Sequence, residues 1–434
     1  MHLLDFLYDY AGFIAIGLLF GFMVLGVPVF VSMAMAVLLS SLITDTPAQV
    51  LRNFAQITWQ GSSIFELVAL PLFILTGTIM QRSEAGADLF AATKAWFGRV
   101  PNSLGVATIS ACTIFAAISG SSIATAATVG LVAVPLLQAE GYGDRRSGGF
   151  VAGGGTLGII IPPSIPLILY GVLTETSIGK LFIAGIVPGL IMASLFALYA
   201  MFSRPTVRTE HKLTWAGRID ATRRGIFVLL LPLVIIASIY LGIFTPTEVG
   251  ALSAIYVLVL GIAQRRLSWS KIVAAVVDAT RTSCMLFMLI VFGQYFAHFL
   301  TFQEIPQAIA SAIISISQGP LAVSLMIFVY LVLGMFLESA AMLLITVPIF
   351  EPVAHQLGMD PLVFGIFACI AMEIAQISPP IGVNLFTIHG ISHIKLSTLA
   401  RGVVPFIIVQ IVMLYVIYFF PILVTWLPST MYAK

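Results

Sequence analysis

Long apolar runs, separated by short polar segments, dominate the chain. A helix needs roughly 20 apolar residues to cross a bilayer, and runs of about this length lie at 8–26, 29–45, 62–81, 145–174, 181–203, 225–243, 248–264, 272–299, 361–391 and 400–427. The stretch from Ala11 to Ile43 is too long for one untilted span and has Gly26-Val27-Pro28 at its middle. We therefore divide it into two helices, with a single bent helix as the alternative. The pattern predicts an all-α polytopic membrane protein.

Two further apolar segments, 103–138 and 320–354, each carry a small or polar tip at the centre. The tips are Ser119-Gly120-Ser121-Ser122 and Glu338-Ser339-Ala340-Ala341. Two short helices that meet at such a tip are typical of a re-entrant hairpin, which is tolerated at membrane depth only when it is buried in protein or lines a wet cavity. Two ordinary transmembrane hairpins, with serines packed between helices, are the alternative. We favour re-entrance because each hairpin directly precedes a run that contains a helix break.

These breaks are proline pairs. Pro162-Pro163 lies within the run 145–174, and Pro379-Pro380 lies within the run 361–391. A proline inside a helix removes a backbone donor and clashes with the preceding turn, so two in succession break the helix. Matched interruptions in the two halves of a membrane protein are the best sequence indication of a transporter's binding site.

The same residue types recur 217 positions apart along the chain. This offset relates the two proline pairs and the tip serines Ser122 and Ser339, and it also relates Pro135 to Pro352, Gly141 to Gly358, Gly185 to Gly402 and Pro188 to Pro405. Each half is predicted to make an odd number of crossings, so the second half enters from the opposite side and the repeats are inverted. We predict a first repeat at 1–203, a cytoplasmic linker at 204–224 and a second repeat at 225–434. This arrangement is typical of alternating-access carriers.

Composition supports the membrane location and excludes other functions. Of the 434 residues, 60% are hydrophobic and 9% are charged, against roughly 25% charged residues in a soluble domain. The formal net charge of +2 indicates no nucleic-acid partner. The clusters of Lys and Arg fall on one predicted side, which the positive-inside rule assigns to the cytoplasm. No arrangement of Ser and His, His and Glu, or paired Asp suggests an enzyme, and the three cysteines, all within apolar runs, are interpreted as buried.

The motifs resemble the large membrane subunit of tripartite ATP-independent periplasmic (TRAP) transporters, in its DctM-like form. The resemblance rests on AAISGSSIATAATVG at 116–130, GYGDRRSGGFVAGGGTLGIIIPPSIPLILYG at 141–171, GIFTPTEVGALSAIY at 242–256 and ISPPIGVNLF at 377–386. It implies a sodium-driven importer of a carboxylate, such as a C4-dicarboxylate or a sugar acid, in the bacterial inner membrane. It also implies a small membrane subunit of about four helices, a periplasmic substrate-binding protein, and a transport domain that moves as an elevator against a scaffold.

Two other transport mechanisms fit parts of this pattern. A single-component sodium/carboxylate symporter would have the same hairpin architecture. An ATP-driven permease subunit is disfavoured because an inverted repeat with broken helices needs no nucleotide. Sodium ions, as coupling ions, are the only metal or cofactor that the resemblance implies.

Sodium is bound by oxygens of carbonyl and hydroxyl groups, with carboxylates optional. We predict two related sodium sites, each built from one hairpin tip and the break that follows it. The first comprises Ser119, Gly120, Ser121, Ser122, Gly155, Thr156, Gly158, Pro162 and Ser164, and the second comprises Glu338, Ser339, Gln376, Ser378, Pro379 and Asn384. The substrate is expected between them, at Ser122, Ser164, Ser339, Pro163, Pro380 and Asn384. The alternative for any single Ser or Thr is a hydroxyl bonded back to its own helix.

Acidic residues inside membrane segments are functional candidates, because a buried charge is costly in lipid. Glu338 at the second tip and Glu373 before the second break fit this description, although Glu373 is also explained as a partner of the scaffold. Glu248, which follows Thr245 at a predicted helix start, is interpreted as a capping residue. Arg281, one turn from Asp278, is interpreted as its ion-pair partner.

Overall fold

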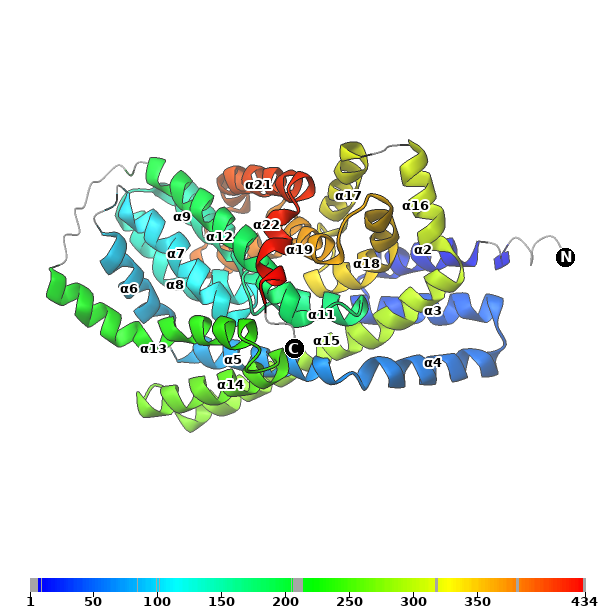
Figure 1. The fold of residues 1–434 in the computed structure, drawn as a ribbon, viewed down its shortest axis with the longest axis horizontal. Helices are drawn as coiled ribbons and strands as arrows, with labels where there is room; N and C mark the ends of the chain where they lie inside the picture. Colours follow the sequence, from blue (N-terminus) through cyan, green and yellow to red (C-terminus); the bar gives the residue numbers. More distant parts are fainter. Residues whose placement is uncertain are drawn as a thin grey trace.

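The computed structural model describes residues 7–8, 10–83, 85–98, 100, 102–203, 205, 214–316, 319–379 and 382–431, and these residues form helices and connecting turns but no strand. Figure 1 shows the helices packed into an elongated body, with the hairpins and broken helices above a long diagonal helix, α15. The first-half helices are α2 (Ala11–Val24), α3 (Val29–Thr44), α4 (Pro47–Ser62), η1 (Phe65–Val68), α5 (Ala69–Arg82), α6 (Ala85–Phe97), α7 (Ser103–Ser119), α8 (Ser122–Ala139), α9 (Gly143–Gly155), α10 (Leu157–Ile160), α11 (Ile165–Leu173) and α12 (Ile178–Phe202). The second-half helices are α13 (Trp215–Tyr240), α14 (Pro246–Ala263), α15 (Trp269–Phe302), α16 (Ile305–Ile316), α17 (Pro320–Leu333), α18 (Ser339–Gln356), α19 (Pro361–Ile377), α20 (Val383–Ser392), α21 (Leu396–Phe419) and α22 (Ile422–Ser429).

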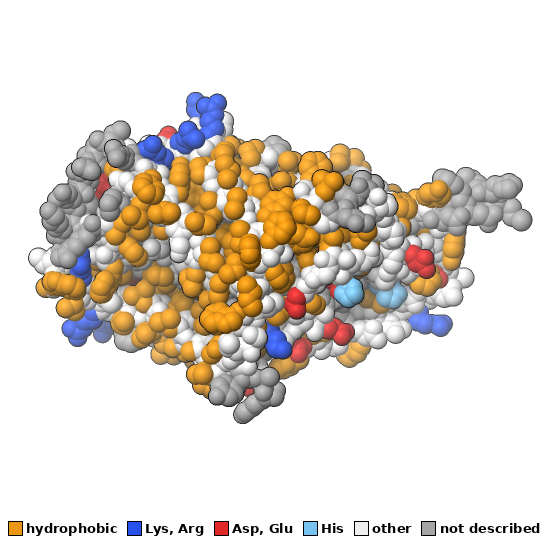
Figure 2. Space-filling view, turned by 45° about the horizontal axis from the view of Figure 1, so that its top comes forward, with side chains coloured by type: hydrophobic (Ala, Val, Ile, Leu, Met, Phe, Trp, Pro, Cys, Tyr) orange, Lys and Arg blue, Asp and Glu red, His pale blue; other side chains and the backbone are white. Residues whose placement is uncertain are grey.

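The all-helical membrane fold is confirmed. Among the described residues, seven helices are long and apolar enough to cross a membrane, or eight when the two parts of the bent helix α13 are joined. Ten spans were expected from the sequence, and the difference arises because helices such as α2, α3 and α19 are shorter than 18 residues. Figure 2 shows one face covered by hydrophobic side chains, with most of its Lys and Arg at the margins. This distribution is the one that a membrane-embedded surface requires.

The N-terminal apolar stretch forms two helices, as we expected. The helix α2 ends at Val24, and α3 begins at Val29 after a turn in which Gly26 adopts φ of +81°. Helices α2 and α3 then pack side by side. The helices α4, α6 and α16 were not predicted, because their sequences carry more polar residues or fewer apolar ones than a membrane span.

Both hairpin segments form two helices joined at the expected tip. The first is α7 and α8, which meet at Gly120-Ser121, and the second is α17 and α18, which are joined by five residues ending at Glu338. The bounds of α18 lie 217 positions after those of α8. At 18 residues, α8 is longer than the short arm we expected and meets the length criterion for a span by itself. Re-entrance and the inversion of the repeats stay predictions.

Both runs that contain a proline pair are divided into separate helices. The first run is divided into α9, α10 and α11, and the second into α19 and α20. Helix α9 packs between the first hairpin and α21, while α20 packs against α8. The second break therefore lies next to the first hairpin, so the two halves of the chain are interleaved at their centre.

A wall of five helices lies along one side of this central unit. We use this name for α3, α4, α5, α14 and α15, which occupy the lower part of Figure 1. Helix α15 runs along α3, α4 and α5. Phe54 of α4 stacks on Phe292 of α15, with ring centroids 5.8 Å apart. The wall thus combines helices from both halves of the sequence.

Three smaller expectations are resolved by the structure. Glu248 caps α14 together with Thr245, as predicted. Arg281 was the wrong partner for Asp278, because Asp278 forms its ion pair with Arg82 of α5 across the wall. The interpretation of Cys284 as buried was also wrong, since this residue is exposed on α15. Most of the predicted linker, 204 and 206–213, lies outside the described residues, and helix α13 begins within the linker at Trp215.

Helices α9 and α21 pack with their backbones in close contact at Gly149 and Gly402. A Cβ atom on Gly149 would lie 2.5 Å from the backbone carbonyl oxygen of Gly402, closer than any real contact. Backbone cannot yield as a side chain can, so Gly149→Ala is expected to destabilise the protein by about 1–3 kcal/mol. A thermal melt of the purified protein in detergent measures this loss.

The matched control is Gly390→Ala in the interior of α20. A Cβ atom there meets no other atom within 4 Å, and alanine is favoured over glycine inside a helix. Its melting temperature is expected to be unchanged or slightly raised. Equal losses for the two variants would contradict the close packing of α9 on α21.

Candidate functional site

A cavity of about 580 Å³ lies between the two hairpin tips and the wall. The tips contribute Ser119 to Ala124 from the first hairpin and Glu338 to Ala340 from the second. Helices α5 and α15 supply the opposite side through Ile74, Gly77, Thr78, Gln81, Asp278, Thr282, Met285 and Leu286. The cavity is thus bounded by elements from both halves of the chain.

The side chain of Gln376 connects the two tips. Its carbonyl oxygen accepts a hydrogen bond of 3.2 Å from the hydroxyl of Ser122, and its amide nitrogen donates to the hydroxyl of Ser339. Ser122 and Ser339 are the first residues of α8 and α18, and they are related by the offset of 217. A residue predicted for the second site therefore contacts both predicted sites.

The hydroxyls of Ser119 and Ser121 bond within the first hairpin. The Ser119 hydroxyl lies 3.0 Å from that of Thr125, which donates to the carbonyl oxygen of Ser121 at 2.8 Å. The Ser121 hydroxyl accepts from the amide of Ala124 and caps α8. These contacts fix the shape of a tip that has only two residues between its helices.

The first break is packed directly against this tip. Gly120 has φ of +62°, and a Cβ atom on it would lie 2.7 Å from the carbonyl oxygen of Pro163. The amide of Ile165 approaches the Gly120 carbonyl oxygen at 3.4 Å. Pro162 is the residue before Pro163 in the same break. Tip and break therefore form one backbone-to-backbone contact that leaves no room for a side chain at Gly120.

The remaining residues of the first predicted site are buried. Gly155 and Gly158 lie against the backbone of Ser122 and Ser121. The Thr156 hydroxyl donates to the Gly153 carbonyl oxygen at 2.6 Å and accepts from Gln410 of α21. Ser164 caps α11 and does not line the cavity. The sequence analysis missed Gln410 and Thr125, because neither lies within a tip or a break.

Only some residues of the second predicted site line the cavity. Glu338 and Ser339 line the cavity, whereas the Ser378 hydroxyl bonds back to the Ile374 carbonyl oxygen of its own helix at 2.6 Å, as the alternative for single hydroxyls anticipated. Asn384 is fully buried, and neither of its side-chain polar atoms has a partner among the described residues. Pro379 is exposed, and Pro380 lies outside the described residues.

The wall brings polar residues to the cavity that the sequence analysis did not assign to it. Thr78 of α5 donates to the Ala275 carbonyl oxygen of α15 at 3.3 Å, and Asp278 is held by Arg82. Thr282 lies one turn further along α15. These residues could be assigned to the cavity only from the packing of α5 on α15, which the sequence alone does not indicate.

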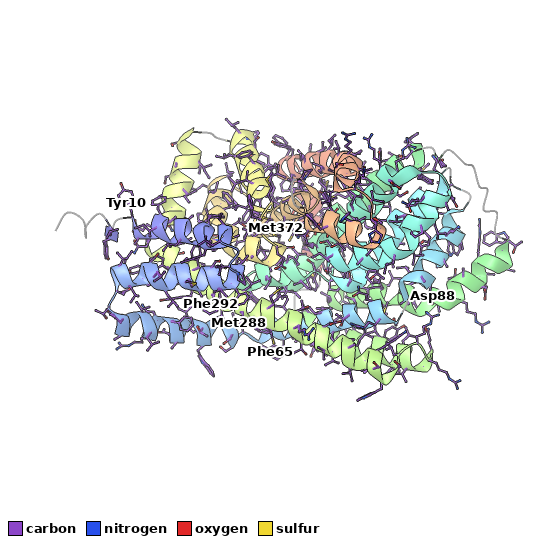
Figure 3. All side chains as sticks on the ribbon, turned by 180° about the vertical axis from the view of Figure 1, so that it is seen from behind. Tyr10, Phe65, Asp88, Met288, Phe292 and Met372 are labelled. Carbon is purple, nitrogen blue, oxygen red and sulfur yellow. The ribbon has the colours of Figure 1, made fainter. Side chains whose placement is uncertain are left out.

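Glu373 lies one turn before Gln376 on α19. Its side chain is completely buried, and neither carboxyl oxygen forms a hydrogen bond with the described residues. It shares one face of α19 with Gln376, whose side-chain carbonyl oxygen accepts from Ser122. Figure 3 labels Met372, the residue before Glu373 on α19, near the middle of the view. No described residue forms a hydrogen bond with Glu373, so its interpretation as a partner of the scaffold stays a prediction.

The chain is similar in sequence to several known transporter proteins and in fold to one solved structure. The chain is 35% identical to a C4-dicarboxylate TRAP transporter large permease protein of Pseudomonas aeruginosa, over 87% of this chain and 90% of that protein. It is 32% identical to a sialic acid TRAP transporter large permease protein of Vibrio cholerae, over 95% and 96% of the two chains. It is also 32% identical to an ectoine TRAP transporter large permease protein of Halomonas elongata, over 94% and 96%.

The fold is similar to that of the YdaH transporter of Alcanivorax borkumensis, with a TM-score of 0.60, 14% sequence identity, and coverage of 88% of this chain and 89% of that one. The relatives are named as permease proteins, so the chain is a transporter component and not an enzyme. The model of the DctM component of the tripartite ATP-independent periplasmic transporters matches residues 16–423. The chain therefore belongs to the DctM family of tripartite ATP-independent periplasmic transporter components.

Proposed function

We propose that the protein is a sodium-coupled secondary active importer of a small organic acid in the bacterial inner membrane. It acts as the large translocating subunit, together with a small membrane subunit and a periplasmic substrate-binding protein. The observation that carries this proposal is the convergence of both hairpin tips on one cavity, joined by Gln376. Family membership supports the tripartite arrangement.

The substrate's carboxylate is recognised by helix N-termini and hydroxyls. Helices α8 and α18 both begin at the cavity, with Ser122 and Ser339 as their first residues. Free amides and the helix dipole favour an anion at such ends. C4-dicarboxylates and sialic acid, which name two of the relatives, share the carboxylate that this arrangement would bind.

Sodium ions bind at the tips and breaks and drive uptake. The backbone carbonyls of Ser121, Ser122 and Pro163 gather where the first tip meets its break, and carbonyl and hydroxyl oxygens suit a hard cation. The wall serves as the scaffold, and the hairpins and broken helices serve as the domain that moves along it. Thr78 and Asp278 make their polar contacts within the wall, so these contacts do not hold the tips in place.

Reconstitution into proteoliposomes tests this function. With the small subunit and the binding protein of the same operon, uptake of the binding protein's ligand is expected when an inward sodium gradient is imposed and ATP is absent. Collapsing the gradient is expected to abolish uptake. Robust uptake by this chain alone would instead support a single-component symporter, and uptake that needs ATP would contradict secondary transport.

Removing the tip hydroxyls is expected to weaken sodium activation. In Ser121→Ala with Ser122→Ala, the first tip loses its α8 cap and its contact with Gln376. The sodium concentration that gives half-maximal uptake should rise about tenfold, which corresponds to the loss of about 1.4 kcal/mol of binding free energy. Initial uptake rates at increasing sodium and constant ionic strength measure this shift.

Ser194→Ala is the matched control for this prediction. Its hydroxyl bonds to the Leu190 carbonyl oxygen of its own helix, α12, on an exposed face. Its sodium activation curve should match that of the unmodified protein. An unchanged curve for the double tip variant would remove the first hairpin from the sodium sites.

A further inference from the structure

The buried acid Glu373 has no role in either predicted sodium site. It lies on α19, the helix that carries Gln376, and no part of its side chain is exposed. It also does not line the cavity between the tips and the wall. The centre of the protein therefore contains a carboxyl group behind the hairpin tips.

No described residue compensates this carboxyl with a hydrogen bond or an ion pair. Both of its oxygens lack a hydrogen-bond partner among the described residues, and no described Lys, Arg or His forms an ion pair with it. An isolated charge buried in protein or lipid is strongly unfavourable, and buried charges are normally paired or coordinate metal ions. A cation bound at this position would compensate the carboxylate, and none of the described residues supplies one.

The neighbouring groups are oxygen donors of the kind that bind alkali cations. Glu373 lies one turn before Gln376 on α19, so the two side chains share one face of this helix. The side-chain carbonyl oxygen of Gln376 lies 3.2 Å from the hydroxyl of Ser122. One carboxylate, one hydroxyl and one amide carbonyl thus meet in a fully buried position, and all of them are hard ligands.

We propose that Glu373, Ser122 and Gln376 bind a sodium ion between the first hairpin and α19. The proposal rests on the sodium coupling proposed above and adds a site that takes residues from both halves of the chain. Each site predicted from the sequence uses one hairpin and its own break, whereas this one joins Ser122 of the first half to Glu373 and Gln376 of the second. A bound ion would therefore hold the two halves of the moving domain together.

Sodium-dependent melting of the purified chain in detergent tests the proposal. Sodium chloride replaces choline chloride at constant ionic strength, and the shift in melting temperature is recorded against sodium concentration. The half-maximal concentration for Glu373→Gln should be at least tenfold higher than for the unmodified protein, because glutamine keeps the shape but cannot carry the negative charge. Unchanged sodium dependence would overturn the proposal, since it would show that the carboxyl is a neutral structural acid.

Glu351→Gln on α18 is the matched control. This residue is only partly buried and lies at the other end of the second hairpin from the tip. Its sodium dependence should match that of the unmodified protein. If Glu373→Gln does not fold, Glu373→Asp replaces it, and weaker sodium binding is again expected because the shorter side chain retracts the carboxylate from Ser122.

The outcomes distinguish this proposal from the proposed function. If sodium does not stabilise the unmodified protein and does not drive its uptake, the sodium-coupled function itself fails. If sodium stabilises the unmodified protein and Glu373→Gln to the same extent, the function stands and only the site at Glu373 is refuted. If Glu373→Gln also lowers the number of sodium ions transported per substrate, the site takes part in coupling.

Discussion

The side-chain amide of Gln376 holds the centre of this structure together. It accepts a hydrogen bond from Ser122 and donates one to Ser339, so a single group contacts equivalent residues of both hairpins. An amide can do this because it carries a donor and an acceptor on the same planar group. This contact lies within about one helical turn of the cavity, of the starts of α8 and α18, and of Glu373. The positions of all of them therefore depend on it.

The membrane explains why the hairpins and breaks are buried so deeply. Backbone groups that leave a helix must find partners inside the protein, since lipid offers none. Here Gly120 brings the first tip against the carbonyl oxygen of Pro163, and α20 packs against α8. The irregular segments thus satisfy one another at the centre, where the same exposed amides and carbonyls can also meet ions and an anionic substrate. Stability and the proposed function therefore involve the same backbone groups of the tips and breaks.

The sequence predicted the local elements well and the contacts between them less well. Both hairpins, both breaks and the division at Gly26 follow from hydrophobic length and from Gly and Pro chemistry, which act over a few residues. The bridge from Gln376 to Ser122, the contact of Gln410 with Thr156 and the pairing of Asp278 with Arg82 join residues 196 to 254 positions apart. No local pattern marks such pairs, and Arg281 was chosen wrongly because it lies close to Asp278 in sequence.

The central claim is that the two hairpins act as one unit through Gln376. A double-mutant cycle of Ser122→Ala and Ser339→Ala, read as the free energy of sodium binding, tests it most directly. We predict a coupling energy of about 0.5 kcal/mol or more between the two changes, and its disappearance when the cycle is repeated in a Gln376→Leu background. Additive effects in both backgrounds would contradict the account.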